Sequence, residues 1–366
     1  MLAGEFAGKT EVKEVCAREF TARGTPYEIG RQVGHAFAER IHLFLRDGLA
    51  RINCIRRVPL SLEEALRQAG TYAACIETAL PDIAAEIGGL ADGAHIRYRE
   101  AILVQIRREL ILSGAEQGDC TSIALQHEGR MLLSQTIDLA GGMEDQAMVL
   151  RVIPQSKEQP RICMFTFTGL CGYFGLNSAG LAVGLNMVVS PGWRAGVPVY
   201  LLIRHLLTRR SIEEALEEIG RIRRASSRYL VLADAHSAVG VEMTVDQHRV
   251  IRGLPLVHTN HFLHPEWQQL DRISGAFRHA SKSRYIRAHT LALAGTPPEA
   301  ILRDHEGFPL SICCHRTGGR SNPETVAAVV SDPEAGTMRV LAGRVCEGKF
   351  RKYGMPVPDE DPLPRS

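Results

Sequence analysis

The sequence contains no apolar run near the roughly 18 residues that a membrane-spanning helix needs. Its first residues, MLAGEFAGKT, show neither the basic region nor the apolar core of a secretory signal peptide. Neither charge is in excess, since 43 Lys and Arg balance 41 Asp and Glu to a net charge of +2. A net charge this small gives no field that would hold a nucleic acid or an anionic membrane. We therefore expect a cytoplasmic protein that has neither as a partner.

Disulfide, metal and cofactor patterns are missing as well. The nine cysteines are an odd number without framework spacing, which suits a reducing compartment. The sequence has no C-x-x-C, no H-E-x-x-H and no H-x-E with a cysteine pair, so we expect no metal site. We interpret the adjacent Cys313 and Cys314 as buried strand residues rather than ligands. No phosphate-cradling Gly-rich loop is evident, so no cofactor is expected, although a coenzyme A thioester stays open as a co-substrate.

The residues that are present are those of an ordinary globular protein. Of 366 residues, 45% are hydrophobic and 23% are charged. Up to residue 119 the pattern is mainly helical, because apolar residues recur at helical spacing in 27–46 and 98–110. The pair Ser61 and Glu64 forms a capping box that begins a further helix.

After residue 120 the hydrophobic period changes to two, which predicts strands. Residues 121–127 and 131–138 flank the turn HEGR and predict a hairpin. Further strands are predicted at 146–153, 161–168, 172–177, 181–188, 228–235, 238–243, 248–258, 324–331 and 336–341, and helices at 196–208, 211–219 and across 266–304. Groups of consecutive strands interrupted by helices indicate an α+β protein with antiparallel sheets and helices packed outside.

Cys120 stands where the helical pattern ends and the first strand of the hairpin begins. An isolated cysteine at a strand start is usually a small buried hydrophobe. If the peptide bond between Asp119 and Cys120 were cut, however, a free α-amino group with a pKa near 7.7–8.0 could take the proton of the thiol. Asp138 ends the partner strand, so its carboxylate would lie at the same open end of the hairpin and could orient that amine.

Several blocks in order along the chain resemble one known family. They are GTPYEIGRQVG (24–34), LADGAHIRYREAILVQIRREL before the candidate cut, GDCTS at the cut, GLNSAGLAVGLN (175–186), HTNHF (258–262), SKSR (281–284) and LRDHEGFPLSICCH (302–315). Together they resemble the isopenicillin-N acyltransferase family (peptidase family C45), whose members are autoproteolytic N-terminal-nucleophile (Ntn) hydrolases. The resemblance implies an αββα four-layer sandwich. It also implies a mainly α-helical segment 1–119 and a catalytic segment 120–366 that form one compact unit and stay associated after cleavage.

The resemblance also assigns roles to residues. Cys120 matches the nucleophile, Asp138 the carboxylate that holds its amine, and Asn260 the residue that helps to stabilise the oxyanion. Arg284 matches the basic residue of the site, which polarises it or binds the polar end of the substrate. Five further residues are candidates for substrate contact or for support of the site: Thr121, Ile137, Leu139, Asn186 and Ser283.

The chain departs from the family pattern at two places. Relatives often carry aromatic residues around the aspartate, whereas this chain has Ile137 and Leu139, which predicts an acyl pocket shaped by aliphatic side chains. The residue before the candidate cut is Asp119 rather than glycine. Its side chain adds bulk to the attack of Cys120 on the preceding carbonyl, or it supplies a local base.

The implied activity is cleavage or transfer of an acyl group from a small N-acyl amide through an S-acyl-Cys120 intermediate. Amide hydrolysis is favoured, and an acyl-coenzyme A-dependent N-acyltransferase is the alternative. A second alternative is a binding protein of the same fold that is never processed. The expected partners are a small acyl amide or thioester and the two cleavage fragments themselves, and a homo-oligomer stays open.

Overall fold

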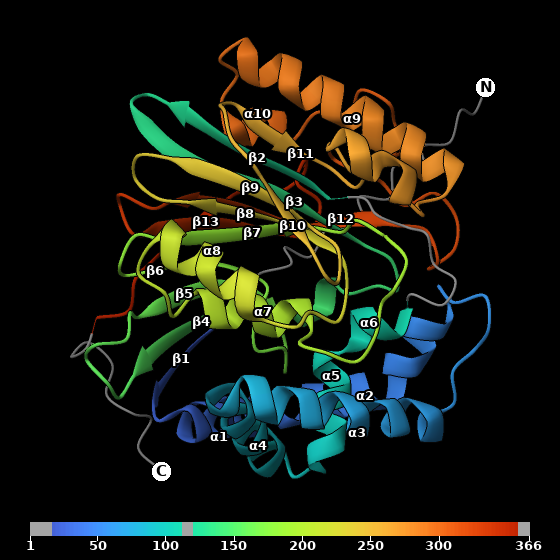
Figure 1. The fold of residues 1–366 in the computed structure, drawn as a ribbon, viewed down its shortest axis with the longest axis vertical. Helices are drawn as coiled ribbons and strands as arrows, with labels where there is room; N and C mark the ends of the chain where they lie inside the picture. Colours follow the sequence, from blue (N-terminus) through green and yellow to red (C-terminus); the bar gives the residue numbers. More distant parts are fainter. Residues whose placement is uncertain (1–16, 112–119, 358–366) are drawn as a thin grey trace, which may run out of the picture.

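Two β-sheets lie face to face between layers of helices in the computed structural model, which describes residues 17–111 and 120–357 (Figure 1). The six-stranded sheet contains, in spatial order, β11 (Leu256–His258), β2 (Thr121–His127), β3 (Arg130–Leu139), β12 (Glu324–Asp332), β13 (Thr337–Ala342) and β14 (Arg351–Gly354). The eight-stranded sheet contains β1 (Arg18–Gly24), β4 (Ala147–Pro154), β5 (Ile162–Phe167), β6 (Phe174–Asn177), β7 (Ala182–Asn186), β8 (Arg228–Ala233), β9 (Ala238–Met243) and β10 (His248–Ile251). Neighbouring strands pair antiparallel, but β1 runs parallel to β4.

Helices cover the outer face of each sheet. The six-stranded sheet is covered by α9 (Gly275–Leu293) and α10 (Pro298–Ile301), and the eight-stranded sheet by α7 (Val199–Leu206) and α8 (Ile212–Arg221) (Figure 1). The N-terminal helices pack at the far side of that second layer and comprise α1 (Pro26–Ala36), α2 (Ala38–Asn53), α3 (Leu62–Ala79), α4 (Pro81–Ala94), α5 (Tyr98–Gln105) and α6 (Arg107–Ile111). Two short 3₁₀ turns are η1 (Glu144–Gln146) and η2 (Pro265–Leu270). The predicted α+β sandwich of two sheets between helical layers is confirmed.

The hairpin that follows Cys120 has the predicted register. Thr121 lies opposite Thr136 and His127 opposite Arg130, so β2 and β3 form a tight two-residue hairpin. The two turn residues, Glu128 (φ 51°) and Gly129 (φ 75°), both adopt positive φ, the conformation that matches the twist of a two-residue turn. The start of β2 and the end of β3 therefore lie together at the open end of the hairpin.

Several predicted boundaries are wrong for local reasons. The strand predicted at 248–258 is two strands in different sheets, because Gly253 adopts φ 117° and the chain crosses from β10 to β11 there. The helix predicted at 27–46 breaks where Phe37 leaves helical geometry at φ −122°. The helix predicted at 98–110 is likewise interrupted at Ile106, which separates α5 from α6. The helical stretch predicted at 266–304 divides into η2, α9 and α10. The boundary predicted between 119 and 120 stays a prediction, because residues 112–119 lie outside the described residues.

Helices α1 and α4 cross at very close range through glycines. A Cβ added at Gly30 would lie 1.8 Å from the carbonyl oxygen of Glu86, and one at Gly89 would lie 1.9 Å from that of Tyr27. No side chain fits at those distances, so the glycines allow the two backbones to touch. Gly30 belongs to the segment 24–34, whose glycines therefore have a packing role.

The glycine contact gives a matched prediction. We expect Gly89→Ala to lower the free energy of unfolding by at least about 1–3 kcal/mol, because the helices must move apart. Its neighbour Gly88 is the control, since a Cβ there meets nothing within 4 Å. Gly88→Ala should be neutral or stabilising by up to about 1 kcal/mol through helix propensity. Urea denaturation of both variants checks this, and equal effects would contradict it.

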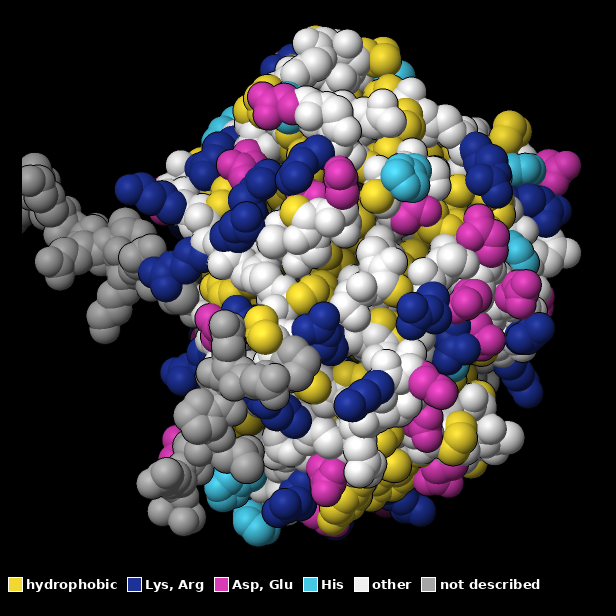
Figure 2. All heavy atoms as spheres, turned by 90° about the vertical axis from the view of Figure 1, so that its left-hand side faces the viewer, with side chains coloured by type: hydrophobic (Ala, Val, Ile, Leu, Met, Phe, Trp, Pro, Cys, Tyr) yellow, Lys and Arg dark blue, Asp and Glu magenta, His cyan; other side chains and the backbone are white. Residues whose placement is uncertain are grey.

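The surface carries both charges without a dominant patch on the face that Figure 2 shows, where Lys and Arg side chains alternate with Asp and Glu. Among the helices of the described residues, none is both long enough and apolar enough to cross a membrane.

Candidate active site

Cys120 immediately precedes β2 and is buried, with 7% of its surface exposed. Its Sγ lies 3.9 Å from the carbonyl oxygen of Asp138, at the end of the neighbouring strand β3. The hairpin thus brings together the two residues that the sequence analysis paired. The bond between Asp119 and Cys120 lies partly outside the described residues, because Asp119 falls within 112–119.

Two side chains from distant segments hold the backbone of Cys120. Arg284 Nη1, on α9, donates a hydrogen bond of 2.9 Å to the carbonyl oxygen of Cys120, and Asn186 Nδ2, at the end of β7, donates another of 2.9 Å. Arg284 Nη1 also donates to Thr121 Oγ1 at 2.9 Å. Because both donors are buried, the head of β2 is fixed between the sheets and α9, and the thiol is fixed with it.

Asn260 lies just after β11 and is fully buried. Its Oδ1 accepts a hydrogen bond of 3.0 Å from Arg284 Nη2, and its Nδ2 donates one of 3.0 Å to the carbonyl oxygen of Met187. Its backbone N–H donates to Ser281 Oγ at 2.8 Å. These contacts fix which way the amide points. An asparagine amide has two N–H donors. One of them donates to Met187, and the other can donate to the oxygen of a reacting carbonyl.

The carboxylate of Asp138 is held from the opposite side. Thr325 lies opposite Asp138 in the pairing of β12 with β3, and Thr325 Oγ1 donates a hydrogen bond of 2.6 Å to Asp138 Oδ1. The hydroxyl of Thr325 also accepts a hydrogen bond of 2.8 Å from the backbone N–H of Cys314. The aspartate is 4% exposed, so its position is determined by the strand pairing rather than by solvent.

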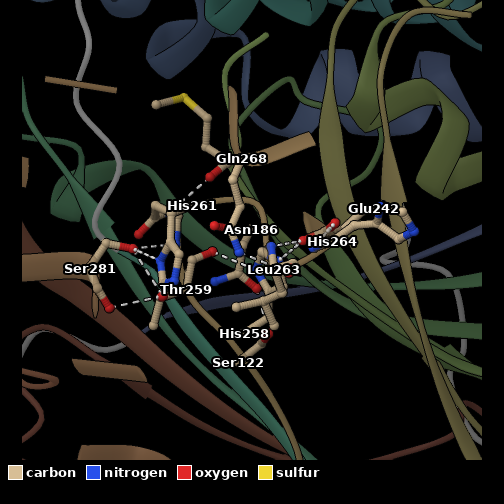
Figure 3. A network of polar contacts seen from close by, with 12 residues as sticks. Ser122, Asn186, Glu242, His258, Thr259, His261, Leu263, His264, Gln268 and Ser281 are labelled. Carbon is tan, nitrogen blue, oxygen red and sulfur yellow. Dashed lines mark hydrogen bonds and ion pairs between the residues drawn. The ribbon is translucent and has the colours of Figure 1, made fainter. Parts of the chain in front are cut away.

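A polar network buried between the sheets and α9 supports these residues (Figure 3). Ser122 donates a hydrogen bond to Asn186 Oδ1, which orients the amide that holds Cys120. On the other side, the Ser281 hydroxyl lies 2.8 Å from Nδ1 of His261, and Thr259 donates to the carbonyl oxygen of Ser281. Burial lowers the pKa of His261 to about 3, so this imidazole is neutral at physiological pH.

His258 forms the far end of the same network. Its Nε2 lies 3.0 Å from Glu242 Oε1, and its ring stacks on that of Tyr229 with centroids 3.7 Å apart. Burial would raise the pKa of Glu242, but the hydrogen bonds from His258 and from two backbone N–H groups outweigh it and lower that pKa. The two histidines that flank Asn260 thus have their own buried partners.

A cavity of about 40 Å³ lies beside Leu139 and is lined by residues from α2, α6, α7 and the segment after β3. The lining combines aliphatic side chains such as Leu139 with Phe44, Tyr200, Arg107 and Arg108, and the aliphatic acyl pocket expected from the sequence stays a prediction. Both Nη atoms of Arg107 are buried, and they lack a hydrogen-bond partner among the described residues. The Arg107 guanidinium stands 4.8 Å from the ring centroid of Phe167, and burial lowers its pKa.

Stacked aromatic rings and a contact from Arg108 lie beside this cavity. Tyr173 and Tyr200 stack with ring centroids 5.1 Å apart. Burial raises the pKa of Tyr173 well above its ordinary value, and Tyr200 and Cys120 raise it further. Arg108 Nη2 lies 2.6 Å from the sulfur of Met187, whose carbonyl accepts the hydrogen bond from Asn260. These contacts connect the wall of the cavity to Asn260.

Of the remaining candidates from the sequence, only some lie at the site. Thr121 is buried against Arg284, and Ile137 is a fully buried residue of the main core. Ser283 is exposed on α9, and Ser281, two residues earlier, is the serine that contacts the site. Sequence reasoning missed Ser281 and Thr325. Ser281 lies in the SKSR block, but nothing in the sequence distinguished it from Ser283, and Thr325 had no signal, because each reaches the site only through helix packing or strand pairing.

Comparison with known proteins agrees with the sequence resemblance. The family model for acyl-coenzyme A:6-aminopenicillanic acid acyl-transferase matches residues 125–345, a range that contains Asp138, Asn260 and Arg284 and begins after Cys120. The acyl-coenzyme A:6-aminopenicillanic-acid-acyltransferase 40 kDa form of Emericella nidulans is 28% identical over 338 residues, which cover 88% of this chain and 92% of that protein.

Solved structures of two hydrolases are also similar. Penicillin V acylase from Agrobacterium tumefaciens has a TM-score of 0.42 and 17% identity, covering 61% of this chain and 82% of that one. A mutant of conjugated bile acid hydrolase from Clostridium perfringens has a TM-score of 0.41 and 14% identity, covering 66% of this chain and 100% of that one. With the family model spanning most of both sheets, the chain belongs to the acyl-coenzyme A:6-aminopenicillanic acid acyl-transferase family.

Proposed function

We propose that the protein is a self-processing cysteine amidohydrolase that cleaves small N-acyl amides through an S-acyl-Cys120 intermediate. The observation that carries the proposal is the convergence of Arg284 and Asn186 on the carbonyl oxygen of Cys120, each at 2.9 Å. These two buried donors hold the backbone of Cys120 in place. A new chain terminus at the start of β2 would need such support, because it has no preceding residue to hold it. A cysteine that only filled the core would not require them.

Maturation comes first. The Cys120 thiol attacks the carbonyl carbon of Asp119, the peptide bond to Cys120 breaks as its nitrogen takes a proton, and a thioester forms. Water then hydrolyses the thioester and leaves residues 1–119 and 120–366 as separate chains. Strand β1 supports their continued association, because it pairs along its length with β4 from the other side of the cut. The helices before the cut also pack on the sheets that follow it.

In turnover the new α-amino group takes the proton of the thiol, and the sulfur attacks the substrate carbonyl. A donor N–H of Asn260 stabilises the oxyanion, and the α-ammonium protonates the leaving amine. Water then attacks the thioester, releases the acid and restores the thiol. Asp138 orients the amine, while Thr325 holds the carboxylate and Arg284 holds the strand in place. No histidine takes part.

The cavity beside Leu139 suggests the class of substrate. The two buried Nη atoms of Arg107 have no hydrogen-bond partner among the described residues, which is costly, and a carboxylate would satisfy both with two parallel hydrogen bonds. We therefore expect N-acyl amino acids, β-lactam acids included, to be better substrates than uncharged N-acyl amines of the same acyl chain. Parallel assays with such matched pairs test this, and equal kcat/KM values for the two members would contradict it.

Acyl transfer is the second candidate, and the Emericella nidulans relative favours it, because that protein is named as an acyltransferase from acyl-coenzyme A to 6-aminopenicillanic acid. Hydrolysis and transfer differ only in whether water or an amine attacks the thioester. Incubation of processed protein with an acyl donor and an amine acceptor separates them. The hydrolase predicts free acid as the main product at every amine concentration, whereas a transferase would produce new amide in proportion to the amine.

Three further expectations stay predictions. They are the cytoplasmic location, the role of coenzyme A thioesters as co-substrates, and the oligomeric state. The non-catalytic binding protein is the alternative to both enzyme proposals. It predicts one uncut chain of 366 residues by intact mass and no acylation of Cys120 by thiol-directed acylating probes.

A further inference from the structure

Two histidines and two cysteines converge beside the six-stranded sheet. His305, Cys313 and His315 lie in the segment between α10 and β12, and Cys346 lies between β13 and β14. One ligand-type atom of each lies within 4.8 Å of the corresponding atom of the other three. The four residues are separate from those assigned to acyl transfer above.

The spacing of these atoms approaches that of a tetrahedral metal shell. His315 Nε2 lies 3.0 Å from His305 Nε2, 3.7 Å from Cys313 Sγ and 3.5 Å from Cys346 Sγ. Zinc binds thiolate sulfur at about 2.3 Å and imidazole nitrogen at about 2.0–2.1 Å, and a tetrahedron with those bonds has edges of about 3.3–3.8 Å. The three separations from His315 Nε2 are close to these edges, and the other pairs lie within 4.8 Å, so a small movement would complete the shell. The set of two nitrogens and two sulfurs is one that zinc prefers.

Independent contacts hold the two loops together at this point. The Arg303 guanidinium donates to the carbonyl oxygens of Val345 and Gly348, on either side of Cys346, the latter at 3.0 Å. The backbone N–H of Cys313 donates to the carbonyl oxygen of Asp304 at 2.9 Å. Cys313 is buried and His305 is exposed, so the group has a fixed base and an open side from which an ion could enter.

We propose that His305, Cys313, His315 and Cys346 bind one zinc ion. Four protein ligands leave no open position, so the ion would be structural rather than catalytic. It would tie the segment before β12 to the segment after β13. No metal site was expected from the sequence, because these four residues follow none of the usual ligand spacings and Cys346 comes from a different loop. Of the adjacent Cys313 and Cys314, only Cys313 belongs to the group.

The site would also brace the candidate active site. Cys314, between two of the ligands, donates its backbone N–H to Thr325 Oγ1 at 2.8 Å, and its carbonyl accepts from the backbone N–H of Thr325 at 2.9 Å. The same hydroxyl donates to Asp138 Oδ1 at 2.6 Å. Zinc would therefore position Thr325 and, through it, Asp138. This last consequence rests on the proposed function, whereas zinc binding does not.

Metal content tests the proposal without any activity assay. Untagged protein, incubated with zinc and exchanged into metal-free buffer, should retain about one equivalent per chain, and the inactive Cys120→Ala protein should retain as much. His305→Ala changes only an exposed ligand, and Cys346→Ser a half-buried one, so neither should prevent folding. Both should retain below about one tenth of an equivalent. Cys54→Ser, at an exposed cysteine elsewhere, is the matched control and should retain the full amount.

Cobalt provides a second readout. Cobalt-loaded wild-type protein should show the visible bands of a tetrahedral ion together with thiolate charge transfer, and Cys346→Ser should lose both. Three results would overturn the proposal: wild-type protein that retains below about one tenth of an equivalent of zinc, an octahedral cobalt spectrum, or a disulfide between Cys313 and Cys346 in peptide maps of freshly purified protein.

Discussion

Cys120→Ala protein should remain a single chain of 366 residues, while the wild type separates into residues 1–119 and 120–366. Alanine has no group that can attack the preceding carbonyl, so the first step of maturation is impossible. The variant should also lose at least about 10³-fold in kcat/KM, because without the thiol no acyl-enzyme can form. Intact-mass measurement and a steady-state assay check the two parts separately.

Two controls separate the chemistry of Cys120 from its packing. Cys120→Ser keeps a weaker nucleophile of similar size in the same buried position, so it should process slowly rather than not at all. Cys171→Ala changes a buried cysteine in the other sheet region and should process at the wild-type rate. Cleavage of Cys120→Ala at the wild-type rate would mean that another residue, or another protein, cuts the chain.

Asn260→Ala should reduce kcat by about 10²–10³-fold, equivalent to roughly 2.7–4 kcal/mol of transition-state stabilisation, with little change in KM. The oxyanion exists only in the transition state and the intermediates, so loss of its donor leaves substrate binding intact. Processing of the precursor should slow as well, since its tetrahedral intermediate uses the same site. Steady-state kinetics on processed protein and a time course of cleavage measure the two effects.

Asn260 also accepts a hydrogen bond from Arg284 at 3.0 Å, so a second variant must separate donation from positioning. Asn260→Asp keeps an acceptor oxygen for Arg284 and removes the N–H donors. The oxyanion role predicts that Asp is at least as damaging as Ala. If Asp restores most of the activity that Ala loses, Asn260 only positions Arg284, and the oxyanion role assigned to it is wrong.

The hairpin shows how much of the site was accessible from the sequence. Alternation of residues on either side of HEGR was enough to pair β2 with β3, and the pairing was enough to bring Cys120 to Asp138. Both facts depend on local pattern and a tight turn, which a single sequence contains. The layered α+β architecture was accessible for the same reason, since it depends on the order of strands and helices.

The rest of the site depends on contacts between segments far apart in the chain. Asn186 reaches Cys120 only because β7 packs across from β2, and Thr325 reaches Asp138 only because β12 pairs with β3. Arg284 was assigned by family resemblance, and its hydrogen bond to Cys120 became visible only with the packing of α9. The four residues around His315 could not be grouped from the sequence for the same reason. They come from two loops that strand pairing brings together.

The most direct measurement of the central claim is mass spectrometry of wild-type protein quenched during turnover of a slowly hydrolysed N-acyl substrate. We expect two chains, the larger beginning with Cys120 and carrying the acyl mass as a hydroxylamine-sensitive thioester on its first residue. An uncut chain, or an acyl group on any other residue, would contradict the assignment of Cys120 as an N-terminal nucleophile.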